Sequence, residues 1–140
     1  SGFDSSPCAL VCARENAIAL GLEMDWLLSD WFSALNDRTW PLIIANPPYI
    51  AADDPHLVQG DLPAEPASAL IGGVSGLESL LHLIQHARDY LTDGGWLLLE
   101  HGFDQGAAVR AVLQEHQYCL VSTRSDWSGH ERLTGGQWRR

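Results

Sequence analysis

The fold is decided by the stretch LIIANPPY, residues Leu42 to Tyr49. Its first four residues are apolar and two of them are β-branched, a pattern that predicts a buried strand. Pro47 and Pro48 have no N–H group for a sheet ladder, so they must end this strand. Ligands of open α/β sheets bind beyond the carboxyl ends of the strands. The stretch therefore predicts that the tetrapeptide Asn46 to Tyr49 lies at a binding site.

The tetrapeptide offers several kinds of interaction to a ligand. The carboxamide of Asn46 is both a donor and an acceptor of hydrogen bonds. The two prolines give a stiff backbone with carbonyl groups that are not needed by a sheet, and Tyr49 adds a flat aromatic ring. Together these groups suit a planar substrate group that carries an NH2.

Outward from this stretch, strand and helix patterns alternate along the chain. The first strand ends at Phe3-Asp4, and a helix capped by Ser5 or Ser6, with Pro7 in its first turn, runs to Gly21. A long proline-containing loop of about residues 50–73 follows the tetrapeptide, and such loops are usually functional or mobile. The further predicted strands are Met24–Ser29, Trp40–Ala45, Trp96–Glu100, Tyr118–Thr123 and Glu131–Trp138, and the further helices are Ser75–Leu91, closed by residues 92–95, and Gln105–Glu115.

This order predicts an α/β fold with a mostly parallel, doubly wound sheet. The core of that sheet is the strand Trp96–Glu100, whose leucines 97–99 we expect to be buried on both faces. The last two strands are joined without a helix, which predicts an antiparallel C-terminal hairpin. Residues 1–140 are enough for one domain, and we expect a single one.

The charge of the chain argues against nucleic-acid binding. Eighteen acidic and eight basic side chains give a net charge of −10, and the only basic cluster is Arg139-Arg140. A protein that grips a phosphate backbone is expected to carry a basic patch, so we expect no direct contact with nucleic acid. No apolar run is long enough to span a membrane and no signal-peptide pattern occurs, so a cytoplasmic location is expected.

Cysteines and histidines give no metal pattern. Cys8, Cys12 and Cys119 fit no zinc spacing and are odd in number, which predicts reduced and mostly buried thiols. Among six histidines only His82 and His86 share a ligand-like spacing, on a predicted amphipathic helix where structural histidines are common. We therefore expect no metal site.

Acidic side chains follow two other predicted strands. Asp4 lies between the end of a strand and the start of a helix, where an acid either caps the helix or takes both hydroxyls of a nucleotide ribose. Asp30-Trp31 follows the next strand. There the acid can accept from an adenine amino group while the indole packs on the ring, although Trp31 can equally be a packing residue. These alternatives stay open from the residues alone.

A family resemblance rests on these residues together. Asn46 to Tyr49 behind an apolar strand, with Asp4 and Asp30-Trp31-Phe32 at two earlier strand ends, resembles the S-adenosylmethionine-dependent methyltransferases that modify planar amino nitrogens. The strings HLVQGDLPAEP, residues 56–66, and LLLEHG, residues 97–102, are similar to the enzymes that methylate the glutamine in the GGQ motif of peptide chain release factors. The resemblance implies a Rossmann-like class I methyltransferase fold, S-adenosylmethionine as cofactor and release factors as partners.

The resemblance also implies roles for single residues. Asp4 would bind the ribose, Asp30 and Trp31 would lie in the cofactor site, and Asn46 would contact both cofactor and substrate. Asn46, Pro47, Pro48 and Tyr49 would hold the glutamine amide, and Asn46, Pro47 and Tyr49 would act in catalysis. Catalysis would come from orientation, because acceptors at Asn46 and at the Pro47 carbonyl aim a weakly nucleophilic nitrogen.

Two departures from the family and two alternative functions remain. Pro63-Ala64 stand where the family usually has a basic residue and an aromatic residue. The family's first strand and glycine-rich turn are expected before residue 1, so the chain is expected to be an N-terminally truncated catalytic domain that is inactive alone. A nucleic-acid amino methyltransferase of the adenine N6 type is an alternative, because its substrate is a similar planar amine. The other alternative is a fragment that binds a partner without catalysis.

Overall fold

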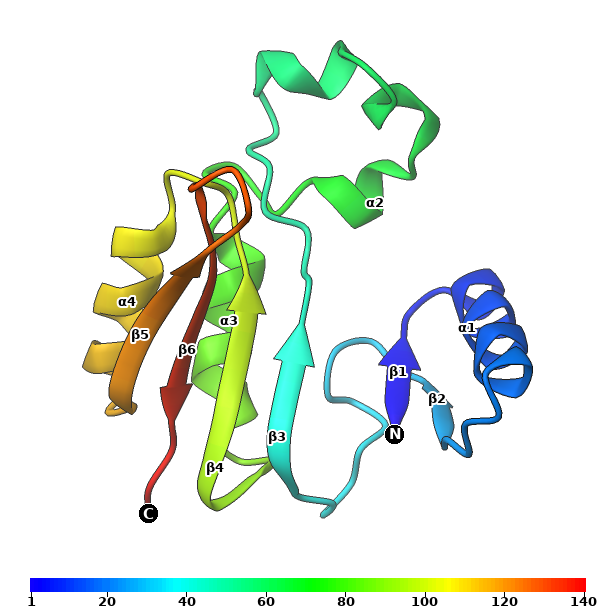
Figure 1. The fold of residues 1–140 in the computed structure, drawn as a ribbon, viewed down its shortest axis with the longest axis vertical. Helices are drawn as coiled ribbons and strands as arrows, with labels where there is room; N and C mark the ends of the chain where they lie inside the picture. The colour runs from blue at the N-terminus through cyan, green and yellow to red at the C-terminus, as the bar shows by residue number, and fades with distance from the viewer. The chain divides into compact units, whose positions relative to one another are not determined.

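A computed structural model describes residues 1–140, which form two compact units, Ser1–Arg38 and Thr39–Arg140 (Figure 1). The single domain expected from the sequence stays a prediction. The first unit contains β1 (Gly2–Asp4), α1 (Pro7–Ala19) and β2 (Trp26–Leu28). The second contains β3 (Trp40–Ala45), the 3-10 helices η1 (Pro55–Val58) and η2 (Leu62–Ala64), α2 (Ala67–Leu70), α3 (Glu78–Ala87), β4 (Leu91–Glu100), α4 (Gly106–Glu115), β5 (Cys119–Ser125) and β6 (Glu131–Gln137).

The first unit is a strand, a capped helix and a second strand that returns beside the first. β1 pairs in parallel with β2. The side chain of Ser6 accepts a hydrogen bond from the N–H of Ala9 at 3.3 Å, and Pro7 is the first residue of α1. Gly21, at a φ of +67°, follows the helix end, where a left-handed residue favours glycine. The predicted cap, the helix and the strand end at Asp4 are confirmed, and the strand predicted over Met24–Ser29 covers only Trp26–Leu28.

The second unit is built on a four-stranded sheet in the order β3-β4-β6-β5. β3 and β4 are parallel, and β6 is antiparallel to both β4 and β5. Three strands therefore run in one direction and β6 runs against them. The predicted antiparallel C-terminal hairpin is confirmed, and the sheet is mixed.

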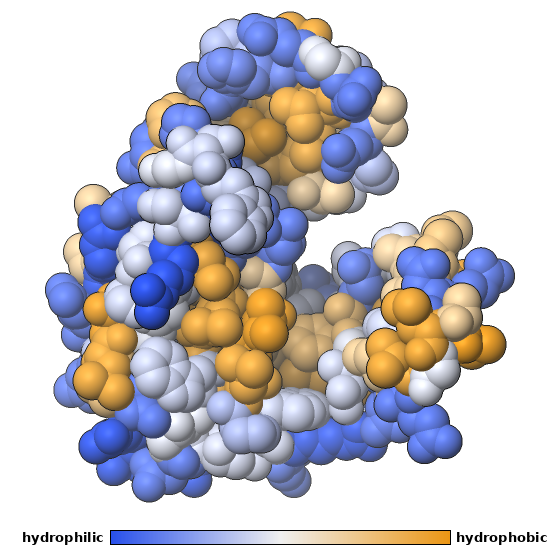
Figure 2. All heavy atoms as spheres, in the orientation of Figure 1, coloured by the Kyte–Doolittle hydropathy of each residue, from blue (hydrophilic) through white to orange (hydrophobic).

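Helices α3 and α4 contact each other and pack on the same face of this sheet, behind the strands in Figure 1. Leu97 and Leu99 of β4 point into this layer and are fully buried. The opposite face carries Leu42 and Ile44, whose exposed fractions are 45% and 66%, and Figure 2 shows apolar atoms gathered over β3 and β4 there. Leu98, which pairs with Ile44, is only half-buried, so the expectation of burial on both faces of β4 is wrong for this unit.

The boundary between α3 and β4 differs from the prediction. The helix expected over Ser75–Leu91 covers only Glu78–Ala87, and β4 begins at Leu91 instead of Trp96. Ser75 lies in the turn before the helix, where its N–H and its hydroxyl donate to the Glu78 carboxylate at 2.9 Å and 3.1 Å. At the other end Leu91 pairs with Trp40, and Gly94 donates to the carbonyl of Trp138. Because of these pairings, residues 91–95 belong to strand β4. Their turn-like sequence had indicated only the end of a helix.

Three further findings concern membrane-spanning helices, metal ligands and cysteines. No helix in the chain combines the length and the apolar character that a membrane span requires. The chain contains no group of three or more His, Cys, Asp or Glu side chains that could hold a metal ion. All three cysteines are free, but Cys8 and Cys12 are exposed, so the expectation of mostly buried thiols is wrong. The inward face of α1 is formed instead by Leu10 and Ala17.

The packing of β4 against the helices predicts that alanine substitutions at two leucines lower the free energy of unfolding by very different amounts. We expect Leu99→Ala to lower the free energy of unfolding by about 2–5 kcal/mol, because it leaves a cavity in a fully buried position. Leu120→Ala on β5 removes the same atoms from a side chain that is 62% exposed and should cost under about 1 kcal/mol. Urea unfolding followed by circular dichroism measures both, and equal losses would contradict this description of the core.

Candidate functional site

The tetrapeptide Asn46 to Tyr49 is held between two paired segments. The ladder between β3 and β4 runs up to the pair Ala45 and Leu99 and then stops. Beyond the prolines the backbone is paired again, since Ile50 forms a parallel bridge with Ile71. The short segment is thus fixed at both ends and leaves the sheet where the sequence predicts.

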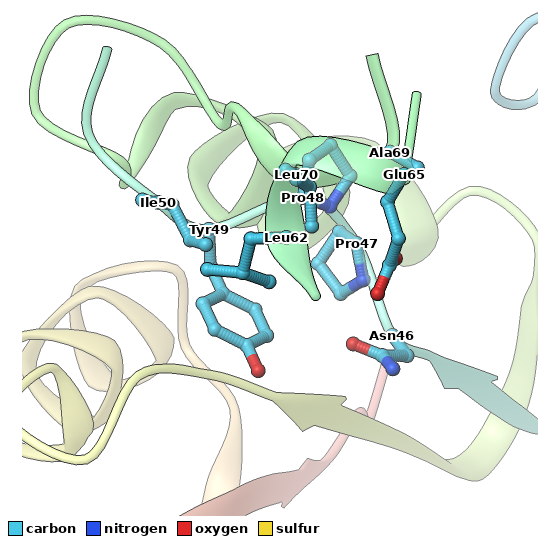
Figure 3. Close-up of a pocket in the computed structure, with 9 residues that line it drawn as sticks. All are labelled: Asn46, Pro47, Pro48, Tyr49, Ile50, Leu62, Glu65, Ala69 and Leu70. Atoms are coloured by element: carbon cyan, nitrogen blue, oxygen red, sulfur yellow. The ribbon is translucent and has the colours of Figure 1, made fainter. Parts of the chain in front are cut away.

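A pocket of about 250 Å³ lies beside this segment. Sites for small molecules usually measure roughly 300–1,000 Å³, so this volume suits a single side chain better than a whole cofactor. The loop predicted from its prolines to be functional or mobile forms the opposite wall with η2 and α2 (Figure 3). The lining residues are Asn46, Pro47, Pro48, Tyr49, Ile50, Leu62, Glu65, Ala69 and Leu70.

Three polar side chains surround the ring of Pro47 in the pocket. In Figure 3 the carboxamide of Asn46 lies below this ring, with the hydroxyl of Tyr49 on the left and the carboxylate of Glu65 on the right. Pro47 is buried, whereas the side chain of Asn46 is exposed and makes no hydrogen bond within the chain. Its donor and its acceptor are therefore available to a ligand.

Tyr49 is fixed by a residue at the end of β4. Its hydroxyl donates to Oε1 of Glu100 at 3.3 Å. Burial, and next the negative charge of Glu100, raise the pKa of Tyr49 above its usual value, while the positive charge of Arg132 opposes them. The phenol is thus neutral at physiological pH and acts as a flat wall and a hydrogen-bond donor.

His101, the histidine of the LLLEHG string, forms hydrogen bonds within the core and does not line the pocket. His101 is fully buried, with Nδ1 at 2.8 Å from the carbonyl oxygen of Gly102 and Nε2 at 2.7 Å from the hydroxyl of Thr134. Both ring nitrogens are therefore engaged away from the pocket. The conformation of the turn after β4 depends on these bonds.

Three of the four residues predicted to contact the cofactor lie in the first unit, and the fourth, Asn46, lies in the second. Asp4 ends β1, and Asp30 and Trp31 follow β2. Because β1 and β2 are parallel, these residues share one edge of the two-stranded sheet. Oδ1 of Asp4 accepts from the N–H of Ser6 at 2.7 Å, so Asp4 does cap the turn before α1, and its second carboxylate oxygen makes no hydrogen bond in the chain.

The backbone around Trp31 is strained and held in place. Trp31 has a φ of +51°, a left-handed value that costs a residue other than glycine about 1–3 kcal/mol and is often found at functional sites. The buried Ser29 holds this turn, since its hydroxyl donates to the carbonyl of Trp31 at 2.8 Å and accepts from the N–H of Ala34 at 3.1 Å.

The structure thus brings the predicted site residues together as two groups. Asp4, Asp30 and Trp31 form one group in the first unit, and residues 46–49 form the other in the second. Ser29 and Glu65 were missed from the sequence. Glu65 lies inside the string 56–66 that carries the family resemblance, and Ser29 directly precedes Asp30, so position along the chain was the one available signal.

No protein-family model matches the chain, but related proteins are numerous. It is 46% identical over 141 residues to the release factor glutamine methyltransferase of Vibrio cholerae, 48% identical over 131 residues to that of Pseudomonas aeruginosa, and 47% identical over 138 residues to that of Salmonella typhimurium. These matches cover 93–99% of the chain. The chain spans about half the length of these relatives.

Solved structures show the same fold. A methyltransferase from Pyrococcus furiosus aligns with a TM-score of 0.73 at 15% identity, over 99% of this chain and 61% of that one. A release factor-specific protein-(glutamine-N5) methyltransferase from Alicyclobacillus acidocaldarius aligns with a TM-score of 0.53 at 20% identity, over 99% and 77%. The class I methyltransferase fold and the family resemblance predicted from the sequence are therefore confirmed.

The contact between Tyr49 and Glu100 predicts that the pKa of Tyr49 depends on the charge of residue 100. We expect Glu100→Gln to lower the pKa of Tyr49, because removal of the carboxylate removes a charge that disfavours the phenolate. Burial remains, so the pKa should stay above its usual value. The absorbance of tyrosinate during an alkaline titration, taken as the difference from the same proteins with Tyr49→Phe, isolates this residue. An unchanged or higher pKa would contradict the contact.

Proposed function

We propose, from this relationship to the release factor glutamine methyltransferases, that the full-length protein containing this chain methylates peptide chain release factors. The methyl group of S-adenosylmethionine would pass to the side-chain amide nitrogen, N5, of the glutamine in the GGQ motif. The observation that carries the proposal is the 46% identity to the Vibrio cholerae enzyme across 99% of the chain. The small pocket at Asn46 to Tyr49 supports it, because its volume suits one side chain.

The pocket residues suit a primary amide as substrate. An amide NH2 has two N–H groups and a poorly nucleophilic nitrogen, so it needs orientation rather than only a base. In the proposed mechanism the side-chain oxygen of Asn46 and the carbonyl of Pro47 accept these two N–H groups. The neutral Tyr49 packs on the amide plane and keeps water away. Both acceptors also favour the positive charge that develops on the nitrogen as the C–N bond forms and the C–S bond of the sulfonium breaks. The methylated nitrogen then loses one of its two protons to solvent, which leaves a neutral methylamide and a neutral thioether.

The first unit has groups that fit the cofactor. Asp4 has a carboxylate oxygen without a hydrogen bond at the end of β1, and the indole of Trp31 follows β2 at the same edge. We propose that Asp4 accepts from the ribose hydroxyls, that Asp30 accepts from the adenine amino group and that Trp31 packs on the adenine. Asn46 would contact the cofactor as well as the substrate. S-adenosylmethionine, when bound, supplies a methyl group on a positively charged sulfur.

Methylation of an amino group in nucleic acid is the alternative enzyme activity. The fold does not separate the two, since a 16S rRNA methyltransferase from Thermus thermophilus, solved with AdoMet and guanosine, aligns with a TM-score of 0.65 at 17% identity. The net charge of −10 and the lack of a basic cluster beyond Arg139-Arg140 favour a protein substrate. Binding of a partner without catalysis is the third possibility for the 140 residues alone.

Mass spectrometry tests the activity directly. We expect the full-length protein with S-adenosylmethionine to add one methyl group to the GGQ glutamine of a release factor. Asn46→Ala should reduce the rate by about 10²–10³-fold, because a preorganised acceptor is lost from the reacting group. Transfer to RNA or DNA with none to the release factor would contradict the proposal.

A matched variant controls for folding in this experiment. Asn16 is exposed on α1, outside both groups of proposed site residues, so Asn16→Ala should keep the wild-type rate. Asn46→Ala should also keep the wild-type unfolding midpoint, since Asn46 makes no hydrogen bond within the chain. An equal rate loss in Asn46→Ala and Asn16→Ala would contradict the proposed role of Asn46 in the reaction.

The two functions considered for Asp4 can be separated by one substitution. Asp4→Asn retains an oxygen that accepts from the N–H of Ser6 but loses the negative charge and the second acceptor. We expect the dissociation constant for S-adenosylmethionine to rise about tenfold or more with the unfolding midpoint unchanged. Calorimetry on the full-length protein measures it, with Asp37→Asn in an exposed loop as control. An unchanged affinity would mean that Asp4 only caps the turn.

A further inference from the structure

The side chain of Gln105 joins three separate parts of the second unit. It lies just before α4 and does not line the pocket. Its Oε1 accepts from the N–H of Gly102 at 2.8 Å, and its Nε2 donates to the carbonyl of Tyr49 at 3.0 Å and to that of Gly76 at 3.4 Å. One half-buried carboxamide thus binds the turn after β4, the end of the tetrapeptide and the glycine-containing turn before α3.

Only one chemical group at position 105 matches this set of partners. The two carbonyl oxygens need N–H donors, and the N–H of Gly102 needs an acceptor. A carboxamide supplies both from one plane, and the partners leave a single orientation for its oxygen and nitrogen. Glutamate keeps the acceptor but places a second oxygen against two carbonyl groups.

Two glycines let the neighbouring turn approach the tetrapeptide from the same side. A Cβ at Gly76 would lie 2.5 Å from the carbonyl oxygen of Tyr49, and one at Gly72 would collide with the carbonyl oxygen of Pro48. Gly76 also has a φ of +79°, which favours glycine. The N–H of Gly72 donates to the carbonyl of Ile50 at 2.9 Å, which keeps the two segments side by side.

The tetrapeptide has little remaining freedom once the Tyr49 carbonyl is held. The preceding end is fixed by the pair of Ala45 with Leu99. Between these points the φ angles of Pro47 and Pro48 are locked by their rings. The orientation of the peptide plane after Tyr49 therefore constrains where the Pro47 carbonyl and the Asn46 side chain point.

We propose that Gln105 is a positioning residue for methyl transfer, acting with Gly72 and Gly76 through the backbone of Pro48 and Tyr49. It holds the Pro47 carbonyl and the Asn46 side chain where they accept the two N–H groups of the substrate amide, and it does not touch the substrate. This inference rests on the proposed function. A misplacement of about 1 Å at such acceptors can lower a rate about a hundredfold.

The test compares Gln105→Glu with Gln114→Glu in the full-length protein. Both changes add one negative charge, and Gln114 is an exposed residue of α4, the helix that follows Gln105. For Gln105→Glu we expect kcat with a release factor to fall about tenfold to a hundredfold, while KM for S-adenosylmethionine stays within about twofold. Gln114→Glu should match the wild type. A wild-type kcat in Gln105→Glu would overturn the inference.

Hydrogen exchange gives a second measurement that needs no activity. The amides of Ile50, Ala52 and Gly72 form the hydrogen bonds between residues 50–52 and residues 70–73. In Gln105→Glu we expect these three amides to exchange faster, while the amides of β4 and α4 exchange at the wild-type rate. An equal increase throughout the chain would overturn the positioning role, as would no increase anywhere. If the wild type methylates no release factor, the proposed function fails, and the exchange data alone still decide whether Gln105 holds this segment.

Discussion

The missing N–H groups of Pro47 and Pro48 are the constraint on which the second unit depends. They end the ladder between β3 and β4 after Ala45, so the chain must leave the sheet at that point. Backbone pairing resumes only at Ile50, which bridges to Ile71 across a loop that turns back over the prolines. The pocket exists because the loop closes over a segment that no strand can pair with.

The chemistry that we propose for this pocket depends on hydrogen-bond acceptors rather than on a strong base. The exposed carboxamide of Asn46 and a proline carbonyl offer two acceptor sites, and Tyr49 stays neutral because burial and Glu100 raise its pKa. In the proposed function these groups would orient a primary amide, and none of them would serve as a strong base. This role would depend on fixed geometry, and the hydrogen bonds of Glu100 and Gln105 to Tyr49 support it.

Local signals in the sequence determined the parts that could be predicted. The bounds of β3 were correct because β-branched residues and a proline pair act within a few positions, and the Ser6 cap was found for the same reason. Residues 91–95 were assigned wrongly because their pairing with Trp40 and Trp138 comes from distant parts of the chain. The role of Gln105 was not predicted for a similar reason, because its hydrogen-bond partner Tyr49 lies 56 residues away in the sequence.

A crystal structure of the full-length protein with S-adenosylhomocysteine and a peptide containing GGQ would show where the substrate glutamine binds. We expect its side chain to enter the pocket beside Tyr49. Its NH2 group should donate to the side-chain oxygen of Asn46 and to the carbonyl oxygen of Pro47. A glutamine amide bound elsewhere, or one whose NH2 group contacts neither acceptor, would contradict the proposed substrate site.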